Sequence, residues 1–149
     1  MTGLATSFRD AEESPGLLLW RVTHTWQAAQ RAALRPFDLT HVQFVLLASL
    51  TWLAVDPERP VSQRDLARHT GTDPMMTSQV LRALEDKGLV ERRPHPTDAR
   101  ARSLVPTSAG VQLANRAVVA VEETDARFFG RLADGGAALV PVLRRLLEA

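Results

Sequence analysis

The spacing of apolar side chains predicts helices along most of the chain. Between residues 14 and 35 they recur every three or four positions, which is the spacing of one face of an amphipathic helix. Ser14-Pro15 is a favourable helix start, and Pro36 ends the helix because the residue before a proline disfavours helical backbone. A second stripe follows Asp38 and runs to Leu53. A loop then begins at Asp56-Pro57.

Two short helices come next, separated by a tight turn. Ser62 caps the first of them, and Asp65 lies three positions later in a capping-box arrangement. His69-Thr70-Gly71 closes this helix and Thr72-Asp73-Pro74 opens the other, which ends at Lys87-Gly88. A helix, a short turn containing glycine and a second helix have the spacing of a helix-turn-helix.

The pattern after Gly88 predicts a β-hairpin and two more helices. Two short extended runs, residues 89–93 and 102–105, flank a segment rich in turn formers, which indicates a hairpin with a long loop. Thr107 caps a long helix that is interrupted near Gly130 or at Asp134–Gly136. The terminal helix carries five apolar side chains that little else in the chain would cover, namely Leu139, Val142, Leu143, Leu146 and Leu147. The fold class is therefore mainly α with a small β-hairpin.

A helical wheel divides the second helix of the pair into a packing face and a polar face. The packing face holds Met76, Thr77, Val80, Leu81 and Leu84, and the other holds Met75, Ser78, Gln79, Arg82 and Asp86. Gln79 suits adenine and Arg82 suits guanine or phosphate in the major groove. The helix N-terminus at Asp73-Pro74 also presents free amides, which would favour a phosphate. A plain solvent-facing helix is the alternative interpretation.

The charge distribution favours DNA. The whole chain carries +1, with 18 basic and 17 acidic side chains. Residues 92–102 alone carry +3, because this segment contains four arginines and one aspartate. These residues are Arg92, Arg93, Arg100, Arg102 and Asp98. A basic hairpin directly after a helix-turn-helix suits a minor groove better than it suits a merely solvated loop.

The sequence resembles the multiple antibiotic resistance regulator (MarR) family of winged-helix transcription factors. Asp98-Ala99-Arg100, followed by Leu104, Pro106-Thr107 and Gly110, resembles the wing signature of the family. Residues 84–92 resemble the exit from its recognition helix, and residues 39–47 resemble its second helix. The match covers nearly the whole chain.

This resemblance implies a single winged helix-turn-helix domain, residues 1–149, that forms a homodimer. Residues 14–35 and 107–149 would be dimerisation helices, and residues 38–106 the DNA-binding lobe. It also implies a pseudo-palindromic double-stranded operator, repression of transcription, and release by a small aromatic, often anionic, effector. Arg100 would enter the minor groove at the wing tip, with Asp98 orienting it.

The effector residues are less well specified. Six side chains on the first two helices could line a pocket, namely Trp20, Arg21, His24, His41, Phe44 and Trp52. Aromatic residues on apolar stripes are more often plain core. The chain has no cysteine, so thiol oxidation cannot be the signal, and its four histidines are scattered rather than spaced as metal ligands.

Other classes of function fit less well. No catalytic motif is present, which argues against an enzyme, and no cofactor is expected. The alternatives that stay open are a winged-helix module that binds protein and a DNA-binding regulator without a ligand. No apolar stretch has the length of a membrane span, and we expect a cytoplasmic protein.

Overall fold

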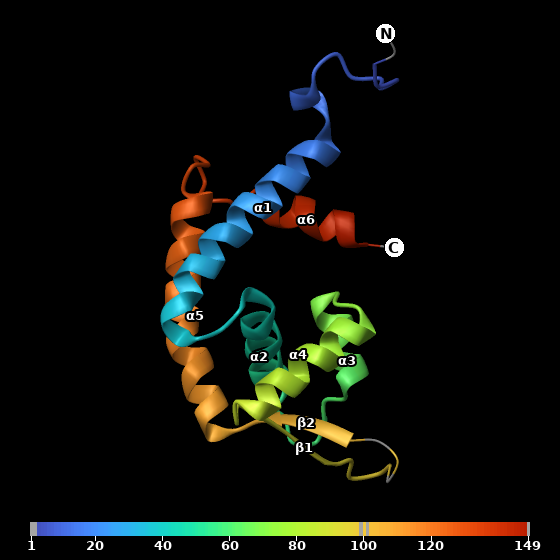
Figure 1. Ribbon diagram of the computed structural model, residues 1–149, viewed down its shortest axis with the longest axis vertical. Helices are drawn as coiled ribbons and strands as arrows, with labels where there is room; N and C mark the ends of the chain where they lie inside the picture. The colour runs from blue at the N-terminus through green and yellow to red at the C-terminus, as the bar shows by residue number, and fades with distance from the viewer. Residues whose placement is uncertain (1–2, 99, 101, 149) are drawn as a thin grey trace.

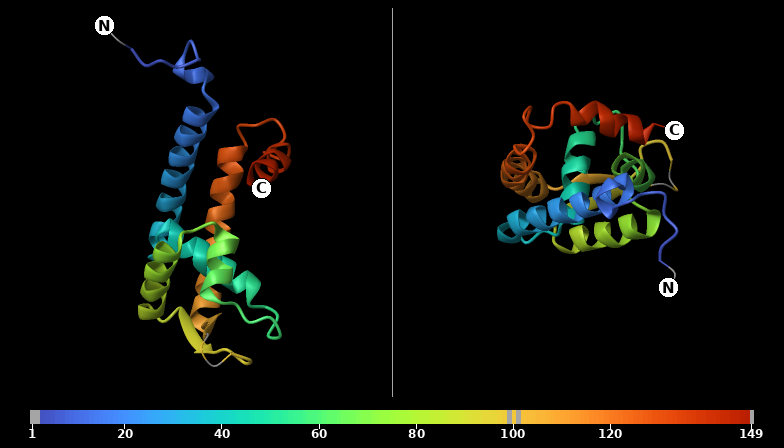
Figure 2. Two further views of the ribbon diagram at one scale, coloured as in Figure 1. Left: turned by 90° about the vertical axis from the view of Figure 1, so that its right-hand side faces the viewer. Right: turned by 90° about the horizontal axis from the view of Figure 1, so that it is seen from above.

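The computed structural model describes residues 3–98, 100 and 102–148 and shows helices with one β-hairpin (Figure 1). The elements are η1 (Ala11–Glu13), α1 (Pro15–Leu34), η2 (Arg35–Phe37), α2 (His41–Leu53), α3 (Gln63–Thr70), α4 (Pro74–Asp86), β1 (Val90–Pro94), β2 (Arg102–Pro106), α5 (Ser108–Phe129) and α6 (Leu139–Leu147). The hairpin lies at one end of the molecule, and the start of α1 with α6 lies toward the other (Figures 1 and 2). The predicted fold class is confirmed.

Side-chain caps begin the helices where the sequence predicts. The Ser14 hydroxyl accepts the amide of Leu17 at the start of α1. Ser62 and Asp65 form the predicted capping box of α3. These bonds satisfy amides that have no partner within the helix, and each stabilises a helix start by about 1 kcal/mol.

Helix α2 is the centre of the hydrophobic core. Leu46, Leu47 and Leu50 are completely buried, and α3, α4, α5 and β2 all contact this helix. The other buried apolar residues are Leu34, Leu39, Phe44, Val61, Leu66, Leu81, Leu84, Leu89, Val90, Leu104, Ala114, Ala117 and Val121. One continuous core therefore fixes the helix-turn-helix to the long helix α5.

The hairpin is anchored to this core at its base. Its strands pair antiparallel from Val90 opposite Pro106 to Pro94 opposite Arg102. A single bridge adds Val61, whose carbonyl accepts the amide of Leu104 at 2.7 Å. Each strand ends one residue later than predicted. This bridge holds the base of the hairpin to the segment before α3.

The start of α5 lies against the turn that joins α4 to β1. The Thr107 hydroxyl donates to the carbonyl of Gly88 at 2.7 Å, and its backbone amide donates to the carbonyl of Leu89 at 3.0 Å. Gly110 passes so close that a Cβ atom there would lie 2.1 Å from the carbonyl oxygen of Leu89. Glycine is therefore required for this packing.

We expect Gly110→Ala to destabilise the fold by about 2–3 kcal/mol, because the clash is with backbone and outweighs the better helix propensity of alanine. Urea unfolding followed by circular dichroism measures this change. Gly16→Ala is the matched control, because its Cβ would meet only the Ser14 hydroxyl, at 3.9 Å. A Gly110→Ala protein as stable as that control would contradict the packing described.

Two helical segments leave large apolar side chains open to solvent in a single chain. On α6, Val142, Leu146 and Leu147 are 53%, 68% and 86% exposed. On the first turns of α1, Leu19 and Trp20 are 54% and 64% exposed. None of the described helices is both long and apolar enough to cross a membrane.

Candidate nucleic-acid interface

The turn between α3 and α4 is fixed by glycine and by a chain of hydroxyl groups. Gly71 ends α3 with a φ of 70°, in the left-handed region that favours glycine. The Thr72 hydroxyl lies 2.9 Å from that of Thr70 and 2.6 Å from that of Thr77. Thr77 is fully buried, so it occupies the inner position at the start of α4. The prediction that Met76 packs inward is wrong, since Met76 is 43% exposed.

The outer face of α4 carries the predicted polar side chains. Gln79 and Arg82 are exposed, Ser78 is half-buried and Met75 is 71% exposed. The guanidinium of Arg82 donates to the Ser78 hydroxyl at 3.3 Å. Leu81 and Leu84 are fully buried on the opposite face, which fixes the rotation of the helix and turns these polar groups outward.

The N-terminus of α4 differs from the expected phosphate site. Pro74 is exposed at the first position of the helix. The carboxylate of Asp73 accepts the amide of Met76 at 2.9 Å. This carboxylate occupies one amide of the predicted phosphate site and adds a negative charge there, and phosphate binding stays a prediction.

Arg92 lies in a different environment from the other hairpin arginines. Its Nε donates to the Glu85 carboxylate at 2.5 Å, and its Nη2 donates to the Gln63 side chain at 3.1 Å. The side chain is only 26% exposed. Arg92 therefore joins β1 to both α4 and α3, and it positions the hairpin beside the helix-turn-helix.

The remaining charged residues of the hairpin face solvent. Arg93, Asp98, Arg100 and Arg102 are all exposed, and Arg93 pairs with Glu91 at 2.6 Å. Asp98 accepts the backbone amide of Arg100 at 3.0 Å. The expected hold on the Arg100 guanidinium is therefore replaced by a hold on its backbone. The neighbouring residues 99 and 101 lie outside the described part of the chain.

Comparison with known proteins agrees with this geometry. The MarR family model matches residues 39–101. The HTH-type transcriptional regulator YdcH of Bacillus subtilis is 43% identical over 124 residues, which are 83% of this chain and 84% of that protein. The HTH-type transcriptional repressor Rv2887 of Mycobacterium tuberculosis is 37% identical over 82% of this chain and 85% of its own.

The chain belongs to the MarR family. It is a DNA-binding transcriptional regulator of the winged helix-turn-helix type, with α4 as the recognition helix and β1–β2 as the wing. The crystal structure of Rv2887 in complex with salicylic acid has a TM-score of 0.69 at 35% identity, covering 93% of this chain and 98% of that one. A mutant of MarR from E. coli complexed with operator DNA has a TM-score of 0.79 at 26% identity, covering 95% and 100%.

In this MarR family chain, the six predicted effector residues lie in separate places. Phe44 is buried in the core at 6% exposure, whereas Trp52 at the end of α2 is 81% exposed beside a hollow of about 360 Å³. Trp20, Arg21 and His24 are exposed on α1, where the rings of Trp20 and His24 lie 4.2 Å apart and Arg21 pairs with Glu12. A single chain therefore forms no common pocket from these residues as described.

His41 instead belongs to a polar junction of three helices that the sequence analysis missed. The indole of Trp26 on α1 donates to the carboxylate of Asp125 on α5 at 2.7 Å. The amide of Gln30, also on α1, donates to the same oxygen at 2.7 Å. His41 of α2 lies edge-on to Trp26, with the ring centroids 5.0 Å apart. Trp26 and Gln30 are one helical turn apart, but no local signal points to Asp125.

Gln30 is the most unusual member of this junction. Its side chain is fully buried, and its Oε1 has no hydrogen-bond partner among the described residues. A buried acceptor without a donor costs about 1–3 kcal/mol. The junction connects the two long helices α1 and α5 with α2.

The stability of this junction is expected to depend on pH. Burial lowers the pKa of His41 below its ordinary 6.5; the charge of Asp125 opposes this and that of Arg31 adds to it. Below pH 6.5 the unfolded chain therefore binds a proton at His41 more readily than the folded chain does. The free energy of unfolding should fall as the pH is lowered below about 6.5.

His41→Gln should flatten this fall in stability, as measured by urea unfolding at a series of pH values. The control is His69→Gln, since His69 is exposed on α3. Equal slopes in the two variants would show that His41 is not responsible.

Proposed function

We propose that this MarR family regulator is a homodimeric repressor whose recognition helix α4 and wing bind a pseudo-palindromic operator. The observation that carries the proposal is the exposed polar face of α4 beside a wing whose Arg93, Arg100 and Arg102 point into solvent. Side chains of this kind read base edges in the major groove and enter narrow minor grooves. Residues 38–106 would form the DNA-binding lobe.

Dimerisation through residues 14–35 and 107–149 is supported by the exposed apolar side chains of α1 and α6. Val142 and Leu146 are one helical turn apart on α6 and are both more than half exposed. Covering such a surface with a second copy would place two recognition helices on half-sites about 34–36 Å apart. The repressor role of this chain is supported by its similarity to the transcriptional repressor Rv2887.

Release by a small aromatic acid is supported by the salicylic acid complex of Rv2887. An effector would act by preferring a dimer geometry whose recognition helices no longer match the operator. With no cysteine in the chain, a thiol switch has no residue to use.

The test is a fluorescence-anisotropy titration of the purified chain against a duplex from its own upstream region. Specific binding that salicylate weakens, and that dilute peroxide and a chelator leave unchanged, is the expected result. Binding that no aromatic acid weakens would favour a ligand-independent regulator. Absence of specific binding would favour a protein-binding module and overturn the proposal.

A further inference from the structure

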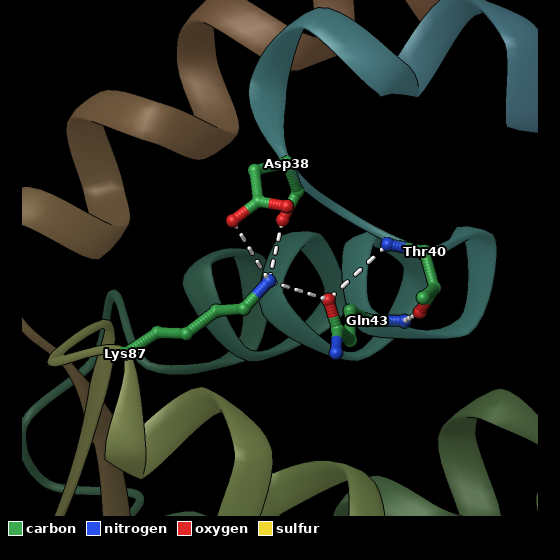
Figure 3. A network of polar contacts seen from close by, with 4 residues as sticks. All are labelled: Asp38, Thr40, Gln43 and Lys87. Atoms are coloured by element: carbon green, nitrogen blue, oxygen red, sulfur yellow. Dashed lines mark hydrogen bonds and ion pairs between the residues drawn. The ribbon is translucent and has the colours of Figure 1, made fainter.

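Lys87 is the single lysine of the chain, against 17 arginines, and it lies at the end of the recognition helix. Its ammonium donates to the backbone carbonyl of Asp38 at 2.5 Å and to Oε1 of Gln43 at 3.1 Å. It also lies 3.7 Å from the Asp38 carboxylate (Figure 3). The ammonium thus donates two hydrogen bonds and forms an ion pair with the Asp38 carboxylate.

These contacts join parts of the molecule that are far apart in sequence. Asp38 follows η2 at the foot of the dimerisation helix α1 and has a left-handed φ of 53°. Gln43 belongs to the capping box of α2, where its side chain also accepts the amide of Thr40 at 3.2 Å (Figure 3). We call Lys87, Asp38 and Gln43 the clasp, because together they hold the end of α4 to the junction of α1 and α2.

The clasp depends on the positive charge and can be reached from solvent. The Lys87 side chain is 33% exposed and borders a depression of about 210 Å³ with Arg35, Leu39 and Thr40. An acylated lysine has no charge and only one N–H donor, so it can keep neither the ion pair with Asp38 nor both hydrogen bonds. The bulk of an acyl group would also have to occupy the space between Lys87 and Asp38.

We propose that Lys87 is a covalent control site, at which acylation by an activated acyl donor opens the clasp and weakens operator binding. The proposal rests on the proposed function. The deprotonated ε-amine attacks the acyl carbonyl carbon and forms an amide C–N bond. The carbonyl–sulfur bond of a thioester, or the carbonyl–oxygen bond of an acyl phosphate, breaks. The thiolate or phosphate leaves with the electron pair, and water takes up the amine proton.

The expected effect is a roughly tenfold loss of operator affinity, within the usual range for coupling between two sites. The affinity falls because α4 would no longer be held relative to α1. The position of α4 relative to α1 sets the spacing of the two recognition helices in the proposed dimer. Lys87 faces Asp38 rather than the outer face of α4, so the dependence of affinity on salt should stay unchanged. A lysine that contacted phosphate would reduce that dependence when neutralised.

The experiment treats the full chain with acetyl phosphate in one arm and acetyl coenzyme A in the other. Mass spectrometry locates the acetyl group, and anisotropy measures operator affinity at several salt concentrations. Lys87→Arg is the control: it keeps the charge, and only its N-terminal amine can react. Lys87→Gln mimics the acetylated state. Asp38→Asn removes the partner charge while retaining a residue that tolerates left-handed backbone.

Support would be acetylation of Lys87 in at least one arm, a tenfold loss of affinity shared by Lys87→Gln, and no change in acetylated Lys87→Arg. Asp38→Asn should also bind more weakly, although bulk electrostatics alone would strengthen its binding. Hydrogen exchange should become faster at residues 38–43 after acetylation. The two arms identify which type of donor acts.

The proposal is overturned if neither donor modifies Lys87, if acetylated and unmodified chains bind equally, or if the loss is accompanied by a reduced salt dependence. If the unmodified chain bound no operator, the proposed function would fail instead. Hydrogen exchange would then still decide whether acetylation opens the clasp, because it needs no DNA.

Discussion

Replacing both Val142 and Leu146 with glutamate is expected to convert the protein into a 16.4 kDa monomer and to weaken operator binding at least a hundredfold. The two side chains are 53% and 68% exposed in a single chain, so the change should leave the protomer folded. In a dimer the same positions would be covered. Burying an unpaired carboxylate costs several kcal/mol, and each interface would contain four. A monomer would also bind each half-site alone and lose the high effective concentration of the linked second site.

Light scattering at micromolar concentration measures the mass, and anisotropy measures operator affinity. The control is Val55→Glu, which puts one glutamate on an 80% exposed valine outside the proposed interface and should leave the mass at twice that of the chain. Circular dichroism verifies that each variant is folded. A double variant that stayed dimeric would show that α6 is not the dimerisation surface.

Much of this fold could be predicted because the signals that define its helices are local. Ser14, Ser62, Asp73 and Thr107 accept hydrogen bonds from amides only three positions ahead, so each cap is visible in a short window of sequence. Gly71 is a local signal too, because the turn needs a left-handed φ of 70° that glycine adopts readily. Local patterns of this kind do not state which face of a helix meets which neighbour.

The limits of charge counting are clear from two adjacent residues of the wing. Arg92 and Arg93 contribute equally to its excess positive charge, yet Arg92 is engaged by Glu85 and Gln63 whereas Arg93 is 62% exposed. Gln63 lies 29 positions from Arg92, and Asp38 lies 49 positions from Lys87. Such pairs form only when the helices pack, so their spacing carries no signal.

The effector residues show the same limit for aromatic side chains. Phe44 and Trp52 are on one helix, but the first is 6% exposed and the second 81%, because only the inner face of α2 meets the core. Trp26 lies within the apolar stripe of residues 14–35, yet the structure gives its indole a carboxylate partner 99 positions away. The presence of an aromatic side chain alone could not predict whether it lies in the core, at the surface or in the polar junction.

The recognition helix and the wing are expected to contribute differently to DNA binding. Gln79→Ala or Arg82→Ala should cost about 1–3 kcal/mol on the preferred operator and relax the sequence preference, because each removes a side chain suited to base edges. Arg100→Ala should weaken binding to all sequences and reduce the salt slope by about one per chain, because its expected contact is electrostatic. Competition with mutated operators and titrations at several salt concentrations separate the two effects.

Arg92→Gln is the control for Arg100→Ala, and counting charges alone would not distinguish the two arginines. It removes the same charge from the same hairpin, but the guanidinium of Arg92 is held by Glu85 at 2.5 Å and is mostly covered. Its loss should therefore lower the free energy of unfolding and leave the salt slope near that of the original chain. Arg100, which is exposed, should show the opposite combination, with unchanged stability and a smaller slope. If Arg100→Ala changed neither affinity nor slope, the wing would not contact DNA, and the recognition helix would have to account for binding alone.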